Sequence, residues 1–215
     1  MWAKRNVVVR ELYLGVNIRI MQPMTPAYLS GAFKSVWTRL RYEVPELCLR
    51  PVAEAGTMWL DVQMPSVRGA REWAEQTAFV QADVAIDGFE RARNKLADVD
   101  ERACLLAQFE AESDRRIRGG YVMIKADHLC MDGIGIRALM GRFLELLALE
   151  FDGLIREPDE GDWSRCPKKL TQPWISNLEP EQDVNGPDLE AAINSHRHLI
   201  LSQMVSLIYK LRSVF

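Results

Sequence analysis

Cysteine is scarce in this chain of 215 residues: the four cysteines lie far apart and form no Cys-x-x-Cys pair. This usage argues against a disulfide framework and is typical of reduced thiols in a cytosolic protein, so we expect a cytoplasmic location. Long apolar runs are also missing, since no segment reaches the ~18 consecutive apolar residues of a membrane span. Because Arg10 interrupts the apolar residues near the N-terminus, we expect no signal-peptide core there either.

An excess of basic residues is the third absence. The formal net charge is -3 and the pI is near 5.7, and no basic stripe carries interleaved aromatic residues. These features argue against nucleic acid as a partner. With 48% hydrophobic and 27% charged residues, the composition is that of a globular protein that can bury a core in one or two domains.

Proline divides the chain into regions. Five of the ten prolines precede residue 66 and the other five lie between residues 158 and 187, so we expect the regular core in the proline-free middle. We predict three parts: an N-terminal lobe over 1–151, an extended Pro-rich acidic connector over 152–187 and an amphipathic helix over 188–215. The apolar stripe of that helix either folds back onto the core or mediates dimerisation.

Apolar residues at helical spacing predict three further helices. The first covers 26–41, with Thr25 as its N-cap and Pro26 in its first turn. The others cover 67–82 and 134–151, and Gly153 is expected to cap the end of the last one.

Alternating apolar residues predict strands over 57–63, 104–111 and 120–127, the last two as a pair joined by a polar turn. In the last strand Val122, Ile124 and Ala126 share one face. His128 has the same parity, so we expect it to extend that apolar face.

The segment His128-Leu129-Cys130-Met131-Asp132-Gly133 joins the last predicted strand to the helix over 134–151. His128 is the only histidine before residue 196, and an unperturbed imidazole titrates near pH 6.5, so it suits a general base. Asp132 is expected to brace the turn through an arginine or backbone donors rather than to take the proton. Gly133 is expected where the backbone bends or closely approaches another group, and amide groups of the helix start are candidates for an oxyanion site.

This constellation resembles the His-x-x-x-Asp-Gly signature of the chloramphenicol-acetyltransferase-like superfamily, and in particular the N-terminal lobe of condensation-domain-like and fungal O-acyltransferase-like proteins. The segment Val44-Pro45-Glu46-Leu47-Cys48-Leu49-Arg50 resembles the exit from the family's first helix. Trp73-Ala74-Glu75-Gln76-Thr77 resembles a segment that many fungal members carry before the motif. The resemblance covers about residues 7 to 150.

The resemblance implies an α/β fold, an α+β two-layer sandwich in which a mixed, largely antiparallel sheet packs on helices. It implies acyl transfer from a coenzyme A or carrier-protein thioester to a hydroxyl or amine of a small-molecule secondary metabolite. His128 would be the base, and Val122, Ile124 and Ala126 would contact substrate. No bound cofactor and no metal are expected, and the thioester is a co-substrate. Arg10 and Arg19 are the candidate partners for Asp132.

The sequence also departs from the family. Many members have two adjacent histidines, whereas position 127 is aspartate, which we expect to bond structurally. Complete monomeric members have two lobes, and nothing after residue 150 resembles a second one. A partner lobe or a homo-oligomer would then complete the site.

Other assignments stay open. The lobe is alternatively a binding, cyclisation or isomerisation protein on the same fold, or an inactive half-length homologue. Cys130 as a nucleophile and His196 with His198 as a metal pair are disfavoured, because neither spacing brings the two groups together. Arg115, Arg116 and Arg118 form either a solvated turn or a docking point for an acidic carrier or a coenzyme phosphate.

Overall fold

The computed structural model describes residues 11–54, 57–62, 65–112, 114, 116–128 and 130–170. All of these belong to one compact unit, Met1–Leu170. The predicted helix over 188–215 lies outside the described residues.

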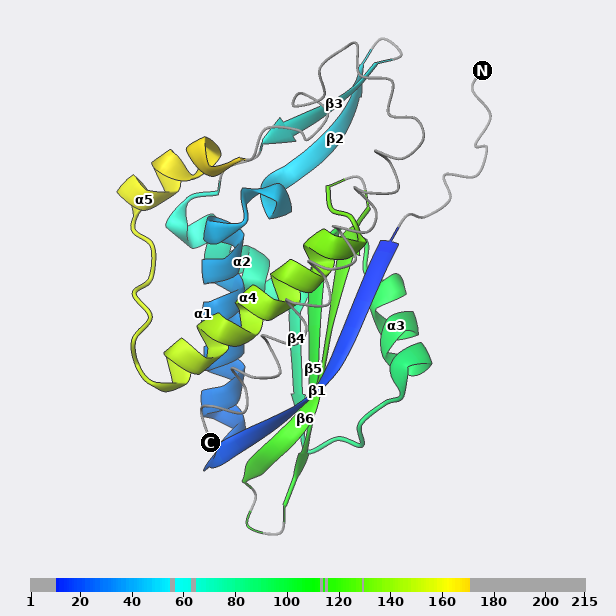
Figure 1. Ribbon diagram of the computed structural model, residues 1–215, viewed down its shortest axis with the longest axis vertical. Coiled ribbons are helices and arrows are strands. Elements are labelled where there is room, and N and C mark those ends of the chain that lie inside the picture. The colour runs from blue at the N-terminus through cyan, green and yellow to red at the C-terminus, as the bar shows by residue number, and fades with distance from the viewer. Residues whose placement is uncertain are drawn as a thin grey trace, which may run out of the picture. The chain divides into compact units, whose positions relative to one another are not determined.

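A mixed four-stranded sheet with the strand order β1-β6-β5-β4 is the centre of this unit (Figure 1). The strands are β1 (Glu11–Met24), β4 (Ala78–Ala82), β5 (Cys104–Ala111) and β6 (Ile117–Asp127). β6 pairs antiparallel with β1 and β5, whereas β4 pairs parallel with β5. A separate antiparallel hairpin consists of β2 (Leu49–Glu54) and β3 (Thr57–Val62).

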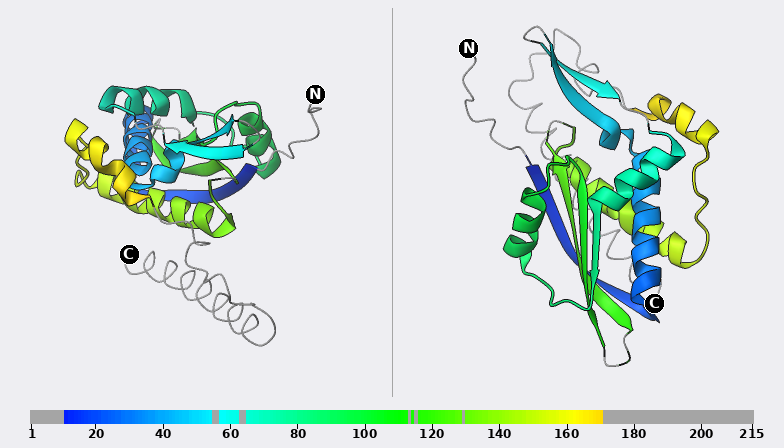
Figure 2. Two further views of the ribbon diagram at one scale, coloured as in Figure 1. Left: turned by 90° about the horizontal axis from the view of Figure 1, so that it is seen from above. Right: turned by 180° about the vertical axis from the view of Figure 1, so that it is seen from behind.

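Helices cover both faces of the four-stranded sheet. The helices are α1 (Pro26–Glu43), α2 (Val67–Thr77), α3 (Phe89–Ala97), α4 (Gly133–Phe151) and α5 (Glu160–Arg165), with short 3-10 helices η1 (Pro45–Cys48) and η2 (Cys166–Lys169). Buried side chains of α1, α2 and α4 share the larger apolar core with one face of the sheet, and those of α3 share a smaller core with the other. The views of Figure 2 agree that α3 lies across the sheet from α1 and α4. The predicted fold class is therefore confirmed.

Strand β6 shows why the sheet is buried on both sides. Val122, Ile124 and Ala126 project into the larger core, as their parity predicts, while Tyr121 and Met123 project into the smaller one under α3. Residues 121–124 are therefore apolar at every position, so this part of the sequence carries only a weak alternation.

Two predicted helices are confirmed almost to the residue. Thr25 caps α1 by accepting a hydrogen bond from the Tyr28 amide at 3.4 Å. At the end of α4 Gly153 adopts a φ of 68°, and the amides of Gly153 and Leu154 bond back to the carbonyls of Glu150 and Leu149. Gly153 therefore caps α4 as expected, because this left-handed conformation favours glycine.

The helix predicted over 67–82 is wrong after Thr77. Residues 78–82 form β4, which lies at the edge of the sheet and pairs in parallel with β5. The Thr77 hydroxyl accepts a hydrogen bond from the buried indole of Trp37 and donates one to the Trp73 carbonyl. These tertiary contacts and the strand partner override the helical spacing of the apolar residues.

Three further differences are local. β6 begins at Ile117, three residues before the predicted strand, because Ile117 pairs with Met24 of β1 and with Ala111 of β5. Within the connector predicted to be extended, residues 160–169 are helical, and Asp159 and Asp162 form a capping box at the start of α5. Helix α3 is not predicted from the sequence, because it is polar and buries only Ala92 and Leu96.

Glu43, at the end of α1, ties α1 to α4. Its carboxylate accepts hydrogen bonds from Arg39 at 2.8 Å and from Arg142 of α4 at 2.6 Å. Burial alone would raise the pKa of Glu43, but the hydrogen bonds from Arg142 and Arg39 outweigh burial and hold it below its usual value.

Because the lowered pKa favours the folded state, the contribution of Glu43 is present at neutral pH and is lost as pH falls through that pKa. We expect Glu43→Gln to lower the free energy of unfolding by about 1–3 kcal/mol at pH 7. The difference from wild type should shrink below about pH 4, as measured by denaturant unfolding at each pH. Glu145→Gln, an exposed partner of the same Arg142, is the control. If Glu43→Gln lowered the free energy of unfolding equally at pH 7 and below about pH 4, the prediction would be contradicted.

Candidate active site at the junction of β6 and α4

His128 is the first residue after β6, in a turn that the Cys130 amide closes by donating to the Asp127 carbonyl at 3.1 Å. Its side chain is exposed. The expectation that His128 extends the apolar face of the strand is therefore wrong, because the ladder ends at Asp127 and the chain turns away. An exposed imidazole at a junction of two regular elements is open to a reactant from outside this unit.

Asp132 is the N-cap of α4. Its Oδ1 accepts hydrogen bonds from the amides of Ile134 at 3.0 Å and Gly135 at 2.6 Å. The carboxylate is thus held by backbone donors at the positive end of the helix, where negative charge is stabilised. Since Asp132 occupies these two amides, they are not the oxyanion donors that we expected at the helix start.

The structure gives no support to either arginine that was predicted as a partner of Asp132. Arg10 lies outside the described residues. Arg19 pairs in register with Gly119, whereas Glu11 pairs with Asp127. Arg19 therefore lies eight residues along β6 from the strand end that leads to the motif, about 26 Å at the usual rise per residue.

The two glycines of the motif region have different surroundings. A Cβ added at Gly135 would meet Met131 Cγ at 2.6 Å, whereas one added at Gly133 would meet nothing within 4 Å. Gly133 does not have a positive φ. The close approach predicted for Gly133 is therefore found at Gly135, and Gly133 borders open space.

This contrast gives a prediction. Gly133→Ala should leave the free energy of unfolding unchanged or raise it by up to ~1 kcal/mol, because alanine favours helix more than glycine does. Gly135→Ala should lower it, because Met131 must move. Thermal unfolding of both variants measures the difference, and a destabilised Gly133→Ala would show that Gly133 has a backbone role in folding.

A small cavity lies beside the turn that carries His128. Its lining residues are Glu46, Leu47, Leu49, Arg102, Ala103, Ala126, Asp127, Cys130 and Met131, and its volume of about 20 Å³ accommodates one or two water molecules. Asp127 forms an ion pair with Arg102 at 2.6 Å, which confirms that it bonds structurally. The cavity is too small for a thioester or a metabolite.

The Cys130 thiol lines this cavity but is not an activated nucleophile. Burial raises the pKa of Cys130 to about 11, and the negative charge of Asp127 adds to the rise. A thiol with such a pKa is almost entirely protonated at neutral pH, so little thiolate is available for attack.

Three residues predicted to contact substrate are core residues. Val122 and Ile124 are completely buried in the larger core, and Ala126 is 2% exposed. Of the three, Ala126 lines the cavity. Arg102 is not among the residues predicted from the sequence, where its one signal is its position two residues before a strand that pairs with β6.

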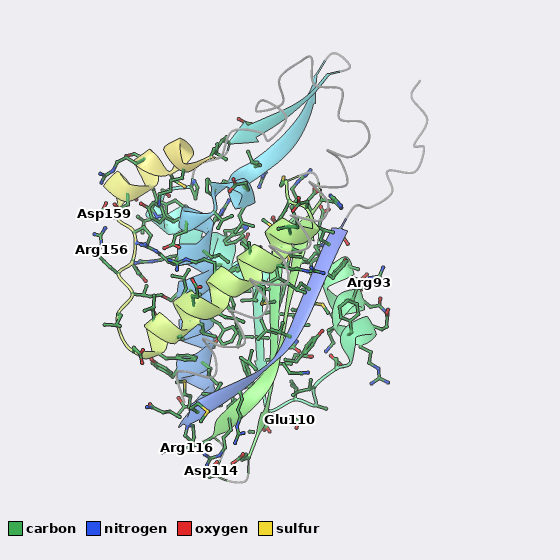
Figure 3. The ribbon with its side chains drawn as sticks, viewed as in Figure 1. Arg93, Glu110, Asp114, Arg116, Arg156 and Asp159 are labelled. Atoms are coloured by element: carbon green, nitrogen blue, oxygen red, sulfur yellow. The ribbon has the colours of Figure 1, made fainter. Side chains whose placement is uncertain are left out.

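Arg116 and Arg118, at the hairpin that joins β5 and β6, are exposed to solvent. Figure 3 shows Asp114 and Arg116 at the tip of this hairpin. Arg118 is paired with Glu112 at 2.6 Å and lies 3.8 Å from Asp114, which neutralises part of the predicted docking point. Arg115 lies outside the described residues.

The described residues contain neither a candidate metal site nor a membrane-spanning helix. No group of three or more histidine, cysteine or acidic side chains in this part of the chain could hold a metal ion. No helix among the same residues has the length and apolar character needed to cross a membrane. The pair His196 and His198 lies outside the described residues.

Solved structures resemble this chain to different degrees. The trichothecene 15-O-acetyltransferase TRI3 of Fusarium sporotrichioides matches with a TM-score of 0.62 and 16% identity, over 90% of this chain and 41% of TRI3. The starter condensation domain of the rhizomide synthetase RzmA matches with a TM-score of 0.48 and 12% identity, over 70% of this chain and 34% of the RzmA chain. TRI101 of F. graminearum, solved with coenzyme A and deoxynivalenol, matches with a TM-score of 0.43 and 12% identity, over 65% of this chain and 35% of TRI101.

The likeness to TRI3 shows the fold: this chain folds as part of that acetyltransferase does. The chain spans about two fifths of the length of TRI3. No protein-family profile and no curated protein sequence matches it.

Proposed function

We propose that this chain contributes the base-bearing lobe of an acyltransferase, with His128 as the general base. The observation that supports the proposal most is the exposed imidazole of His128 between β6 and α4, on a fold shared with the acetyltransferase TRI3. Asp132 holds the start of α4, and β6 is anchored between β1 and β5. The imidazole is therefore attached to rigid structure on both sides.

In the proposed reaction, the imidazole of His128 takes the proton from a hydroxyl or amine of the acceptor. The acceptor oxygen or nitrogen then forms a bond to the carbonyl carbon of an acyl thioester, and the carbon–sulfur bond breaks. The thiolate of coenzyme A or of a carrier protein leaves and receives the proton from the imidazolium. A positioned base of this kind contributes about 100- to 10,000-fold to the rate.

The proposal includes a covering partner for His128. The cavity beside the turn holds only one or two waters, and the described residues leave the imidazole exposed. Donor and acceptor therefore need walls from elsewhere: a second lobe, a second copy of this chain or a carrier protein. A small molecule of secondary metabolism, as in the resemblance, is the proposed acceptor.

The test uses the full 215-residue chain with acetyl and longer acyl thioesters of coenzyme A and a panel of hydroxyl and amine acceptors. Release of the free coenzyme A thiol measures acyl transfer, and calorimetric titration of each acceptor measures binding separately. We expect thiol release that depends on the acceptor. The assay includes any protein that co-purifies with the chain. If an acceptor binds but no thioester is consumed, the result would favour the binding or isomerisation alternative. Neither activity would favour an inactive homologue.

A further inference from the structure

The end of the sheet that leads to His128 is held by charged pairs. The last residues in register between β5 and β6 are Cys104 and Lys125. Two residues before Cys104 and two after Lys125 are Arg102 and Asp127, which form an ion pair just beyond the ladder. Their NH1 and Oδ2 atoms are 2.6 Å apart, and the Asp127 side chain is only 20% exposed.

Asp127 connects this ion pair to the turn. Its carboxylate binds Arg102, while its carbonyl accepts the hydrogen bond from Cys130 that closes the turn around His128. Arg102, Asp127 and Cys130 also line the same small cavity. A displacement of the Asp127 backbone would therefore move the residue that follows it, which is His128.

The neighbouring cation does not take over the role of Arg102. Lys125 is 1% exposed, forms an ion pair with Glu11 of β1 and donates to the carbonyls of Leu96 at 3.0 Å and Val99 at 2.6 Å. Its ammonium group has three donors and three acceptors are already in place. The segment before β5 thus supplies Arg102 as a cation for Asp127.

We propose that Arg102 is a positioning residue for His128, acting through its ion pair with Asp127. The proposal rests on the proposed function. Arg102 binds Asp127 at the strand end, and Asp127 in turn sets the place from which the His128 imidazole projects. A base that is out of place by about 1 Å can lose up to ~100-fold in rate, although the fold is intact.

The test compares Arg102→Gln with Arg118→Gln in the full chain. Arg118 forms an ion pair with Glu112 at the same distance of 2.6 Å, at the opposite end of the same strand pair, and is the matched control. Hydrogen exchange of a peptide spanning 126–131 should be about threefold faster in Arg102→Gln, as expected for loss of one partly exposed ion pair. It should be unchanged in Arg118→Gln.

Kinetics supply the second readout. Arg102→Gln should lower kcat about 10- to 100-fold with little change in KM, because Arg102 acts through the base and not through substrate contact. Arg102→Lys, which keeps the charge, should restore part of kcat. Circular dichroism checks that each variant is folded.

The outcomes are separable. Equal exchange and equal kcat in Arg102→Gln and Arg118→Gln would overturn the positioning role. If the wild-type chain transfers no acyl group, the proposed function fails, and the exchange comparison alone then decides whether Arg102 holds the turn. Faster exchange with unchanged kcat would show a role in the stability of the turn and none in positioning the base.

Discussion

Replacing His128 by alanine is expected to lower acyl-thioester turnover about 100- to 10,000-fold. The proposed reaction requires removal of a proton from the acceptor, and His128 is the proposed acceptor of that proton. Because its side chain is exposed in a turn, the free energy of unfolding should change by no more than about 0.5 kcal/mol. Stopped-flow or steady-state release of the coenzyme A thiol measures the first effect, and thermal unfolding measures the second.

Two further variants make this result specific. Asn94 lies on the exposed side of α3. The control variant Asn94→Ala should retain wild-type turnover, which shows that substitution and purification alone do not lower it. Asp132→Ala should lower stability by about 0.5–2 kcal/mol, because α4 loses its N-cap. A His128→Ala variant that is folded and fully active would remove His128 from the mechanism.

Phe33→Ala is expected to lower the free energy of unfolding by about 3–5 kcal/mol. Phe33 is completely buried in α1. Its ring lies 5.3 Å from that of Phe109 in β5, edge to face, and 5.5 Å from that of Phe143 in α4. Removal of the ring leaves a cavity where α1, α4 and the sheet meet. Domains of this size are stable by about 5–15 kcal/mol, so the loss is a large share of the total.

Phe89→Ala is the matched control, since Phe89 begins α3 and its side chain is 45% exposed. We expect its effect to stay within about 0.5 kcal/mol. Urea unfolding at 25 °C measures both variants. Equal effects of the two substitutions would contradict the placement of Phe33 at the centre of the core.

Helices α1 and α4 were predictable because each carries its own signals. The Thr25 cap, the proline in the first turn of α1 and the left-handed Gly153 act within a few residues of the helix ends. β4 was not predictable in the same way, since no glycine or proline separates its residues from the helical pattern that ends at Thr77. They form a strand only because β5 offers a parallel partner.

The candidate site likewise has features that the local sequence predicts and features that it does not. A histidine between a strand and a helix, and an aspartate at the start of that helix, are local features, and the sequence shows both. The exposure of His128, the cavity beside it and the ion pair between Arg102 and Asp127 join residues far apart in the chain. No pattern within a single segment contains that information.

By itself, the sequence determined that this chain is a globular α/β protein with a His-x-x-x-Asp-Gly segment between a strand and a helix. Helical spacing and capping residues decide such elements locally. Only the tertiary structure decided that β6 is buried on both faces and that Arg102 pairs with Asp127 beside the turn of His128. These features depend on strand register and on packing between distant segments, which are set when the sheet and helices assemble.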